Sequence, residues 1–207
     1  MLRFWRGGAG WLILCLAGAY LAAYAQVIEF ENNGLKYLAI TRQGLTIMYS
    51  RMPTRIREFD MIQVAVENGS HISVTIRPED FTVITHDGRE LVGAPARLVI
   101  DEVMEKGSHN DMVKLVVAYE NALYAIPNMR VSNGYEERRR NAIGGGSMAK
   151  FRAAAAASAI ALVQSRIVSG QSTDGAVFIP NESKSHWDHV KVKANGEVFD
   201  FVVEAKQ

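Results

Sequence analysis

Cysteine is almost absent from this chain of 207 residues: Cys15 is the only one, and it lies in an apolar stretch near the start. A lipoprotein attachment site needs a small residue directly before its cysteine, and Leu14 stands there instead. Once the start of the chain is removed, no disulfide can form, so the rest must be stabilised by its hydrophobic core alone. This pattern is more typical of a bacterial envelope or secreted protein than of an animal ectodomain.

An excess of charge of either sign is also lacking. The chain has 23 basic and 22 acidic residues, and removal of Arg3 and Arg6 leaves 21 against 22, a net charge of −1. No strongly basic face follows from such a balance, so we expect no nucleic-acid partner. A Walker phosphate-binding sequence is absent too, and we expect no cofactor.

The first 25 residues have the three parts of a secretory signal peptide. Arg3 and Arg6 give a positive start, an apolar run covers residues 11–23, and small residues at Ala23 and Ala25 suit a signal peptidase. We predict cleavage between Ala25 and Gln26, and export to the periplasm or the outside of the cell. A retained membrane anchor is the alternative, but the run is shorter than the ~20 residues that a span requires. After cleavage we expect no transmembrane span.

The first third of the mature chain is predicted to be rich in strands. Apolar residues recur with the two-residue period of a strand, and turn signals such as Asn68-Gly69 and Asp87-Gly88 separate the segments. The predicted strands are Leu35 to Thr41, Leu45 to Tyr49, Met61 to Glu67, His71 to Ile76, Phe81 to Thr85 and Arg89 to Val92.

The middle third changes to a helical period. From Ser108 onward apolar residues recur every three or four positions, and Ser108 with Asp111 resembles a capping box at the start of a helix that Pro127 ends. The clearest helical pattern, with five consecutive alanines, covers Met148 to Val168. A short charged helix is predicted at Tyr135 to Asn141.

The last third returns to strands. Ala176 to Ile179 forms one, and the segments on either side of Asn195-Gly196 form a hairpin with a two-residue turn. This turn sets the register: Val192 faces Phe199, Val190 faces Phe201, and Lys191 faces Asp200.

These patterns together predict a mainly β protein with an α insertion: one antiparallel β-sandwich domain over residues 26–207, interrupted by two to four helices at about 95–170. We expect the terminal hairpin to complete the sheet that begins near Leu35. Because the strands cluster instead of alternating with helices, a simple βαβ architecture is disfavoured.

Two stretches of the chain resemble the bacterial exported immunoglobulin-like domains. The residues 64–70, 76–81 and 87–88 match a "V-x-V-x-N-x-S … P-x-D-F-x-V … D-G" pattern, and residues 174–180 match its later "G-x-V-x-F-x-P" strand. The resemblance covers roughly residues 35–92 and 175–203. It implies an immunoglobulin-like sandwich and an exported location, and it implies no catalytic chemistry. The long helical insertion departs from the family pattern.

One segment has the residue types of a metal site. His186, Asp188 and His189 bring two imidazoles and a carboxylate within four residues, although a metal ion needs a further ligand from elsewhere. The competing interpretation is a polar loop ahead of the hairpin, with Trp187 packed on the sandwich.

The function that these observations predict is an exported, non-catalytic binding or envelope-associated module, with a protein partner in the cell envelope. The first alternative is a metal-binding protein or metal-dependent enzyme that uses the segment from His186 to His189. The second is a serine hydrolase, because Ser147 and Lys150 match the S-x-x-K motif, but the K-T-G and S-D-N partner motifs are absent. The sequence leaves the ligand and the oligomeric state undetermined.

Overall fold

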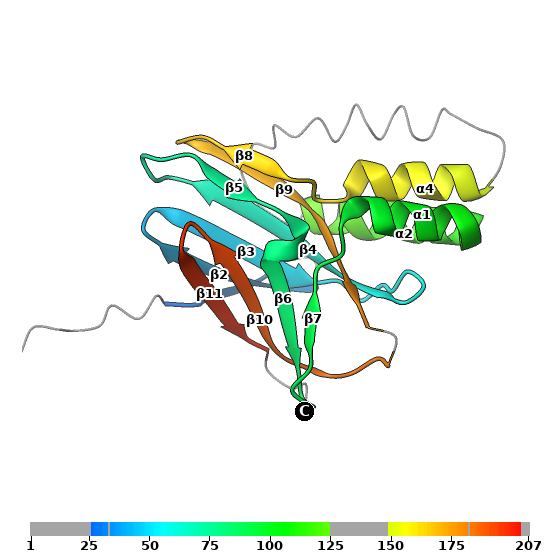
Figure 1. Ribbon diagram of the computed structural model, residues 1–207, viewed down its shortest axis with the longest axis horizontal. Helices are drawn as coiled ribbons and strands as arrows, with labels where there is room; N and C mark the ends of the chain where they lie inside the picture. Colours follow the sequence, from blue (N-terminus) through cyan, green and yellow to red (C-terminus); the bar gives the residue numbers. More distant parts are fainter. Residues whose placement is uncertain (1–25, 33, 125–148, 182, 204–207) are drawn as a thin grey trace, which may run out of the picture.

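The computed structural model describes residues 26–32, 34–124, 149–181 and 183–203. Over this part of the chain the fold is mainly antiparallel β structure with three helices set between the strands (Figure 1). The predicted signal peptide, Ala25, the charged segment 135–141 and Ser147 all lie outside the described residues.

A five-stranded antiparallel sheet forms one layer of the sandwich, in the order β1-β2-β3-β4-β9. Its interior strand β4 is buried on both faces over almost its whole length, including the polar residues Asp60 and Gln63. The strand bounds are β1 Ile28–Asn32, β2 Leu35–Arg42, β3 Leu45–Arg51, β4 Phe59–Asn68 and β9 Gln171–Pro180.

A four-stranded antiparallel sheet faces it, in the order β11-β10-β6-β7. Strands β5 and β8 form a separate two-stranded sheet. One hydrophobic core fills the space between the sheets, and Tyr49 meets Phe201 edge-on across it, with ring centroids 4.9 Å apart. The bounds are β5 Val74–Ile76, β6 Phe81–Thr85, β7 Glu90–Val92, β8 Ser165–Ile167, β10 Trp187–Ala194 and β11 Glu197–Val202.

Three helices, α1 Ala96–Lys106, α2 His109–Tyr124 and α4 Ala149–Ile160, form a second core on the outer face of the five-stranded sheet. The alanine-rich side of α4 packs there with Val99 and Val103 of α1 and Leu115 of α2, over Met61 and Phe178 of the sheet. The small alanines permit close approach of the helices, so this layer closes over β4 and β9.

The helix start predicted at Ser108 and the register of the terminal hairpin are confirmed by the structure. Ser108 caps α2 as predicted: its backbone N–H and hydroxyl donate to Asp111 Oδ2, both at 2.8 Å. The hairpin has the predicted register, with Val192 opposite Phe199 and Lys191 opposite Asp200.

Three predictions of the fold were wrong. The helix expected over 148–168 ends at Ile160, because the chain then crosses the edge of β9 and residues 165–167 form β8. The strand expected from His71 begins only at Val74 and pairs with β8. The terminal hairpin joins β6 and not the sheet that begins near Leu35.

The side chain of Asn68 explains the second correction. Its amide donates to the carbonyls of Ile72 (2.7 Å) and Ile167 (2.9 Å), and its carbonyl accepts from the hydroxyl of Ser70. These side-chain bonds hold the loop and direct the chain out of the first sheet, so the Asn68-Gly69 turn joins no β-hairpin. Helix α1 lies within the predicted insertion but was not predicted individually.

The free edge of β9 is covered by two chain crossings. In the first crossing, the N–H of Ala94 donates to the Phe178 carbonyl at 2.8 Å. In the second, the N–H of Leu162 donates to the Ala176 carbonyl, also at 2.8 Å. A Cβ atom on Gly175 would lie 2.7 Å from Leu162 Cα, so glycine is required where the second crossing meets the strand. The crossings protect an edge that would otherwise be open to strand pairing.

Candidate functional site

The segment predicted as a metal site lies at the start of β10. Trp187 points inward and is buried in the sandwich core, as the competing interpretation of this segment expected. The pairing of β10 with β6 shifts between Trp187 and His189, which leaves Asp188 as the extra residue of a β-bulge. Asp188 and His189, at the bulge, are both half-buried, while His186 before it is exposed.

The structure gives these side chains separate partners. His189 Nδ1 lies 2.8 Å from Asp200 Oδ1 on β11, and Asp188 Oδ2 lies 3.2 Å from Nδ1 of His86, in the turn after β6. His186 takes part through its backbone, whose carbonyl accepts from the N–H of His86 at 2.9 Å. In the part of the chain that the structure describes, no three His, Cys, Asp or Glu side chains form a group that could hold a metal ion.

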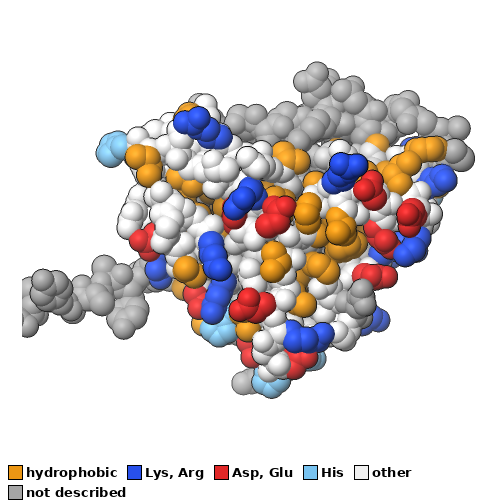
Figure 2. Space-filling model, viewed as in Figure 1, with side chains coloured by type: hydrophobic (Ala, Val, Ile, Leu, Met, Phe, Trp, Pro, Cys, Tyr) orange, Lys and Arg blue, Asp and Glu red, His pale blue; other side chains and the backbone are white. Residues whose placement is uncertain are grey.

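His189 belongs to a larger surface, which we call the hairpin face: the outer side of the four-stranded sheet. The strand registers place ten side chains on it in three rows: Val198 and Lys193; Asp200, Lys191, Thr82 and Val92; and Val202, His189, Ile84 and Glu90. Figure 2 shows this side of the molecule, where hydrophobic, basic and acidic side chains are interspersed.

The hairpin face is open, in contrast to the outer face of the five-stranded sheet. Val92, Val198 and Val202 are 46%, 42% and 61% exposed. On the other sheet, the outward-facing Tyr37 and Gln63 are fully buried, whereas Ile28 on the edge strand β1 is 58% exposed. Burial raises the pKa of the Tyr37 hydroxyl to about 12. The two outer faces therefore differ: the helices cover one of them over β4 and β9, and the other is uncovered and presents valines and charged groups to the surroundings.

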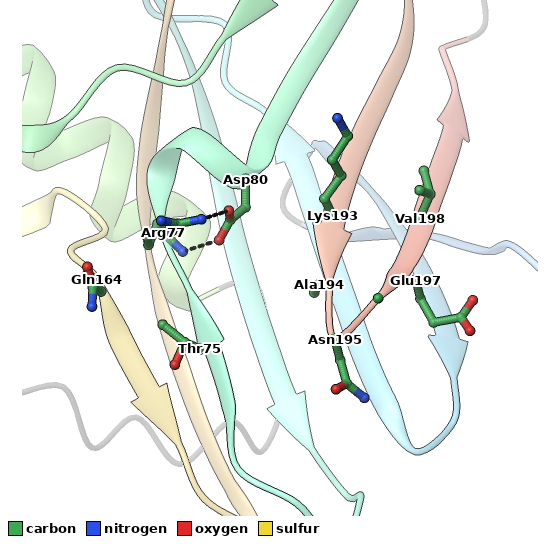
Figure 3. Close-up of a pocket in the computed structure, with 10 residues that line it drawn as sticks. Thr75, Arg77, Asp80, Gln164, Lys193, Ala194, Asn195, Glu197 and Val198 are labelled. Atoms are coloured by element: carbon green, nitrogen blue, oxygen red, sulfur yellow. Dashed lines mark hydrogen bonds and ion pairs between the residues drawn. The ribbon is translucent and has the colours of Figure 1, made fainter.

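At the turn end of the hairpin, the sandwich opens into a groove with a volume of about 600 Å³. Thr75 of β5, the short 3-10 helix η1 (Pro78–Asp80) with the preceding Arg77, and Gln164 form one side. The hairpin residues 193–198 form the other. Figure 3 shows Arg77 directed toward Asp80 on the η1 side of the groove, and Glu197 directed away from the groove. We call this feature the turn groove.

The acidic groups of the turn groove are engaged within the fold. Asp80 accepts from the backbone N–H of Arg77 (2.8 Å) and from its guanidinium (2.9 Å), and this hydrogen bond raises the pKa of Arg77. Glu197 accepts from the Gln43 amide at 2.6 Å and pairs with Arg42 at 3.6 Å. Lys193 makes no ion pair with any described residue.

The sequence did not indicate the turn groove. The Asn195-Gly196 turn and Lys193 beside it could be read from the chain, but Arg77 and Gln164 come to the same place only through tertiary packing. Lys150 of the S-x-x-K motif is exposed in the first turn of α4, and its amine lies 5.6 Å from the ring of Phe151. Among the described residues, none of the helices is both long enough and apolar enough to cross a membrane.

The chain was compared with family models, curated proteins and solved structures. No family model, no curated protein and no solved structure matches the chain.

Proposed function

We propose that this protein is an exported, non-catalytic binding module of the immunoglobulin-like kind, which recognises a protein partner in the cell envelope through the hairpin face. The observation that carries the proposal is the contrast between the two outer faces: the helices cover one over β4 and β9, while the other is uncovered and exposes Val92, Val198 and Val202 among charged groups. Aliphatic side chains within a polar surround are the usual composition of a protein-recognition surface.

The location is part of the proposal and has its own test. Cleavage before Gln26 leaves two residues ahead of β1, so the edge strand of the sheet would follow the new N-terminus directly. Mass spectrometry of the protein from fractionated cells of its native host should find an N-terminal peptide that starts at Gln26, in the envelope fraction. A chain that retains its first 25 residues in the cytoplasm would contradict the exported location.

Site-specific crosslinking tests the surface. A photo-crosslinking amino acid is placed at Val198 or Val202 on the hairpin face, and at Lys114 on the exposed side of α2 as the control. We expect one dominant partner from the two valine positions in native cells, and no such product from Lys114. Capture from Lys114 alone would assign recognition to the helical insertion and would refute the hairpin face.

A further inference from the structure

Strand β11 is the outermost strand of the four-stranded sheet, and one side of its backbone meets no neighbouring strand among the described residues (Figure 1). The N–H of Val203 donates to the Asp188 carbonyl at 2.8 Å. This bond lies next to the pair of His189 and Val202 and identifies it as a non-hydrogen-bonded pair of the β10–β11 ladder. The N–H and C=O of Val202 therefore point away from β10, toward the free edge.

The same orientation repeats at every second residue of the strand. Hydrogen-bonded and non-hydrogen-bonded pairs alternate along an antiparallel ladder, so Val198 and Asp200 also direct their N–H and C=O groups to the free edge. The side chains of these three residues lie on the hairpin face, and both valines are exposed there. Each open ladder position thus carries a side chain that a neighbouring strand would contact on the same face.

The other edges of the two facing sheets differ from that of β11. The edge of β9 is covered by two chain crossings, and β7 has only three residues. Strand β1 has five residues, of which Glu29 and Glu31 are charged and exposed. Covering segments, short strands and charges are means by which proteins prevent pairing at an edge. In contrast, β11 has six residues, and no described strand pairs with its outer side.

The sandwich is uncovered at the place where a strand beside β11 would lie. Strand β11 contacts β2 across the layers, and its Phe201 meets Tyr49 of β3. Beyond β2 lies only β1, whose Glu29 pairs with the core residue Leu38, so the side chain of Glu29 is on the side of the four-stranded sheet. Glu29 is nevertheless exposed, so no described strand of that sheet covers β1.

The charge at the centre of β11 disfavours a second copy of the chain as the neighbour. Asp200 is the middle one of the three open positions, with a valine two residues away on each side. If two β11 strands paired antiparallel with Val198 opposite Val202, the two Asp200 carboxylates would lie directly opposite each other, which is destabilising. A basic residue opposite Asp200 has no such conflict. Lys191 already takes this place on the β10 side, with its ammonium 3.9 Å from the carboxylate.

We infer that β11 binds an extended segment of the protein partner, which adds to the four-stranded sheet as an antiparallel fifth strand. Its main chain pairs with the open N–H and C=O groups of Val198, Asp200 and Val202. Its outward side chains continue the hairpin face, with apolar residues beside the two valines and a basic residue beside Asp200. In such strand addition, main-chain bonds provide affinity and side-chain contacts provide specificity. The inference rests on the proposed function and names the part of the partner that the face recognises.

The test uses the peptide acetyl-Thr-Val-Thr-Lys-Thr-Val-Thr-amide, whose valines and lysine match the three open positions. N-methylation of its lysine removes the N–H that faces Asp200, whereas N-methylation of the threonine before the lysine removes an N–H that points away from β11. Each peptide is titrated to about 10 mM, a range that detects millimolar affinity, into isotope-labelled protein expressed from the full sequence and followed by amide NMR.

We expect saturable shifts at the amides of Val198, Asp200 and Val202 with the unmethylated peptide. The N-methyl-lysine peptide should bind at least about fivefold more weakly, and the N-methyl-threonine peptide within about twofold. A peptide with glutamate in place of lysine should bind about two- to fivefold more weakly, because its carboxylate faces Asp200. Absence of shifts at about 10 mM peptide, or equal binding by the two methylated peptides, would overturn the inference.

Val202→Pro repeats the test from the side of the protein. Proline removes the open N–H of Val202 but none of the bonds between β10 and β11, because this N–H points to the free edge. Val202→Thr keeps the N–H and is the matched control. Proline should weaken peptide binding at least about fivefold and threonine less than about twofold, with unchanged amide spectra away from β11. Equal binding by both variants would contradict the added strand.

Dilution of the protein without peptide tests the other occupant. If dilution from about 1 mM to about 0.05 mM moves the same three amides, β11 pairs with a second copy of the chain, and the assignment to a partner strand is wrong. We expect no such change.

The two proposals can fail separately. If crosslinks from Val198 and Val202 capture a partner while no peptide binds, the hairpin face stands and the added strand does not. If the peptides bind in the expected order but no crosslink forms in cells, the strand site at β11 stands and the proposed function of the face does not.

Discussion

Replacement of Gly175 by alanine tests whether the crossing over β9 depends on close backbone contact. The added Cβ would lie 2.7 Å from Leu162 Cα and 2.8 Å from its backbone nitrogen, whereas nonbonded carbon atoms prefer about 3.5–4.0 Å. The crossing chain must therefore move by about 1 Å. That shift breaks the 2.8 Å bond from the Leu162 N–H to the Ala176 carbonyl and disturbs Leu162, which is buried in the sandwich core.

The expected loss in the free energy of unfolding follows from these effects. Overpacking of a close contact costs about 1–3 kcal/mol, and a buried hydrogen bond left unmade costs about 1–3 kcal/mol. Alanine gains about 0.4–1 kcal/mol through the unfolded chain. We therefore expect Gly175→Ala to lower the free energy of unfolding by about 2–4 kcal/mol in a urea titration followed by circular dichroism.

Gly88→Ala is the matched control for this substitution. Gly88 has a φ of +79° and open space around a built Cβ, so its replacement costs only the left-handed backbone penalty of about 1–2 kcal/mol. The reasoning would be refuted by a loss below about 0.5 kcal/mol for Gly175→Ala, because the backbone contact would then relax without cost.

Three further predictions concern the core, a partly buried ion pair and the histidines. Burial raises the pKa of the Tyr49 hydroxyl. Above about pH 10 the unfolded state therefore loses this proton before the folded state does, and the free energy of unfolding falls by up to ~1.4 kcal/mol per pH unit. Tyr49→Phe should flatten this alkaline decline in denaturation measured from about pH 9 to 11. Asp60 is buried and its carboxylate lies 2.5 Å from Nη1 of the partly exposed Arg55, so Asp60→Ala should cost about 1.5–3 kcal/mol by the same denaturation assay, and a loss under about 0.5 kcal/mol would contradict this. The double replacement of His186 and His189 by alanine should leave the metal content of the purified protein unchanged; metal bound by the wild type and lost from this variant would support the metal-binding alternative.

The open surface could be predicted only in part. The alternation along β10 and β11 and the Asn195-Gly196 turn were sufficient to place Lys191 opposite Asp200, and the structure confirms this pair. The turn groove could not be predicted, since Arg77 and Lys193 are more than a hundred residues apart in sequence and line the same groove only in the folded structure. The partners of His189 and Asp188 likewise depended on a β-bulge that no local pattern indicates.

What the sequence determined by itself is local. The two-residue period, the Ser108–Asp111 capping box and the turn glycines act over a few neighbouring residues, so β2, β3, β6, the start of α2 and the hairpin register follow from the chain alone. Tertiary structure decided which sheet each strand joins and where α4 ends. Ile167 continues the helical spacing of Ile160 and Val163, yet Ser165–Ile167 forms β8 because β5 offers a pairing edge and Gly175 lets the chain cross β9. Competition between such local propensity and distant hydrogen-bond partners is settled only when the whole core is assembled.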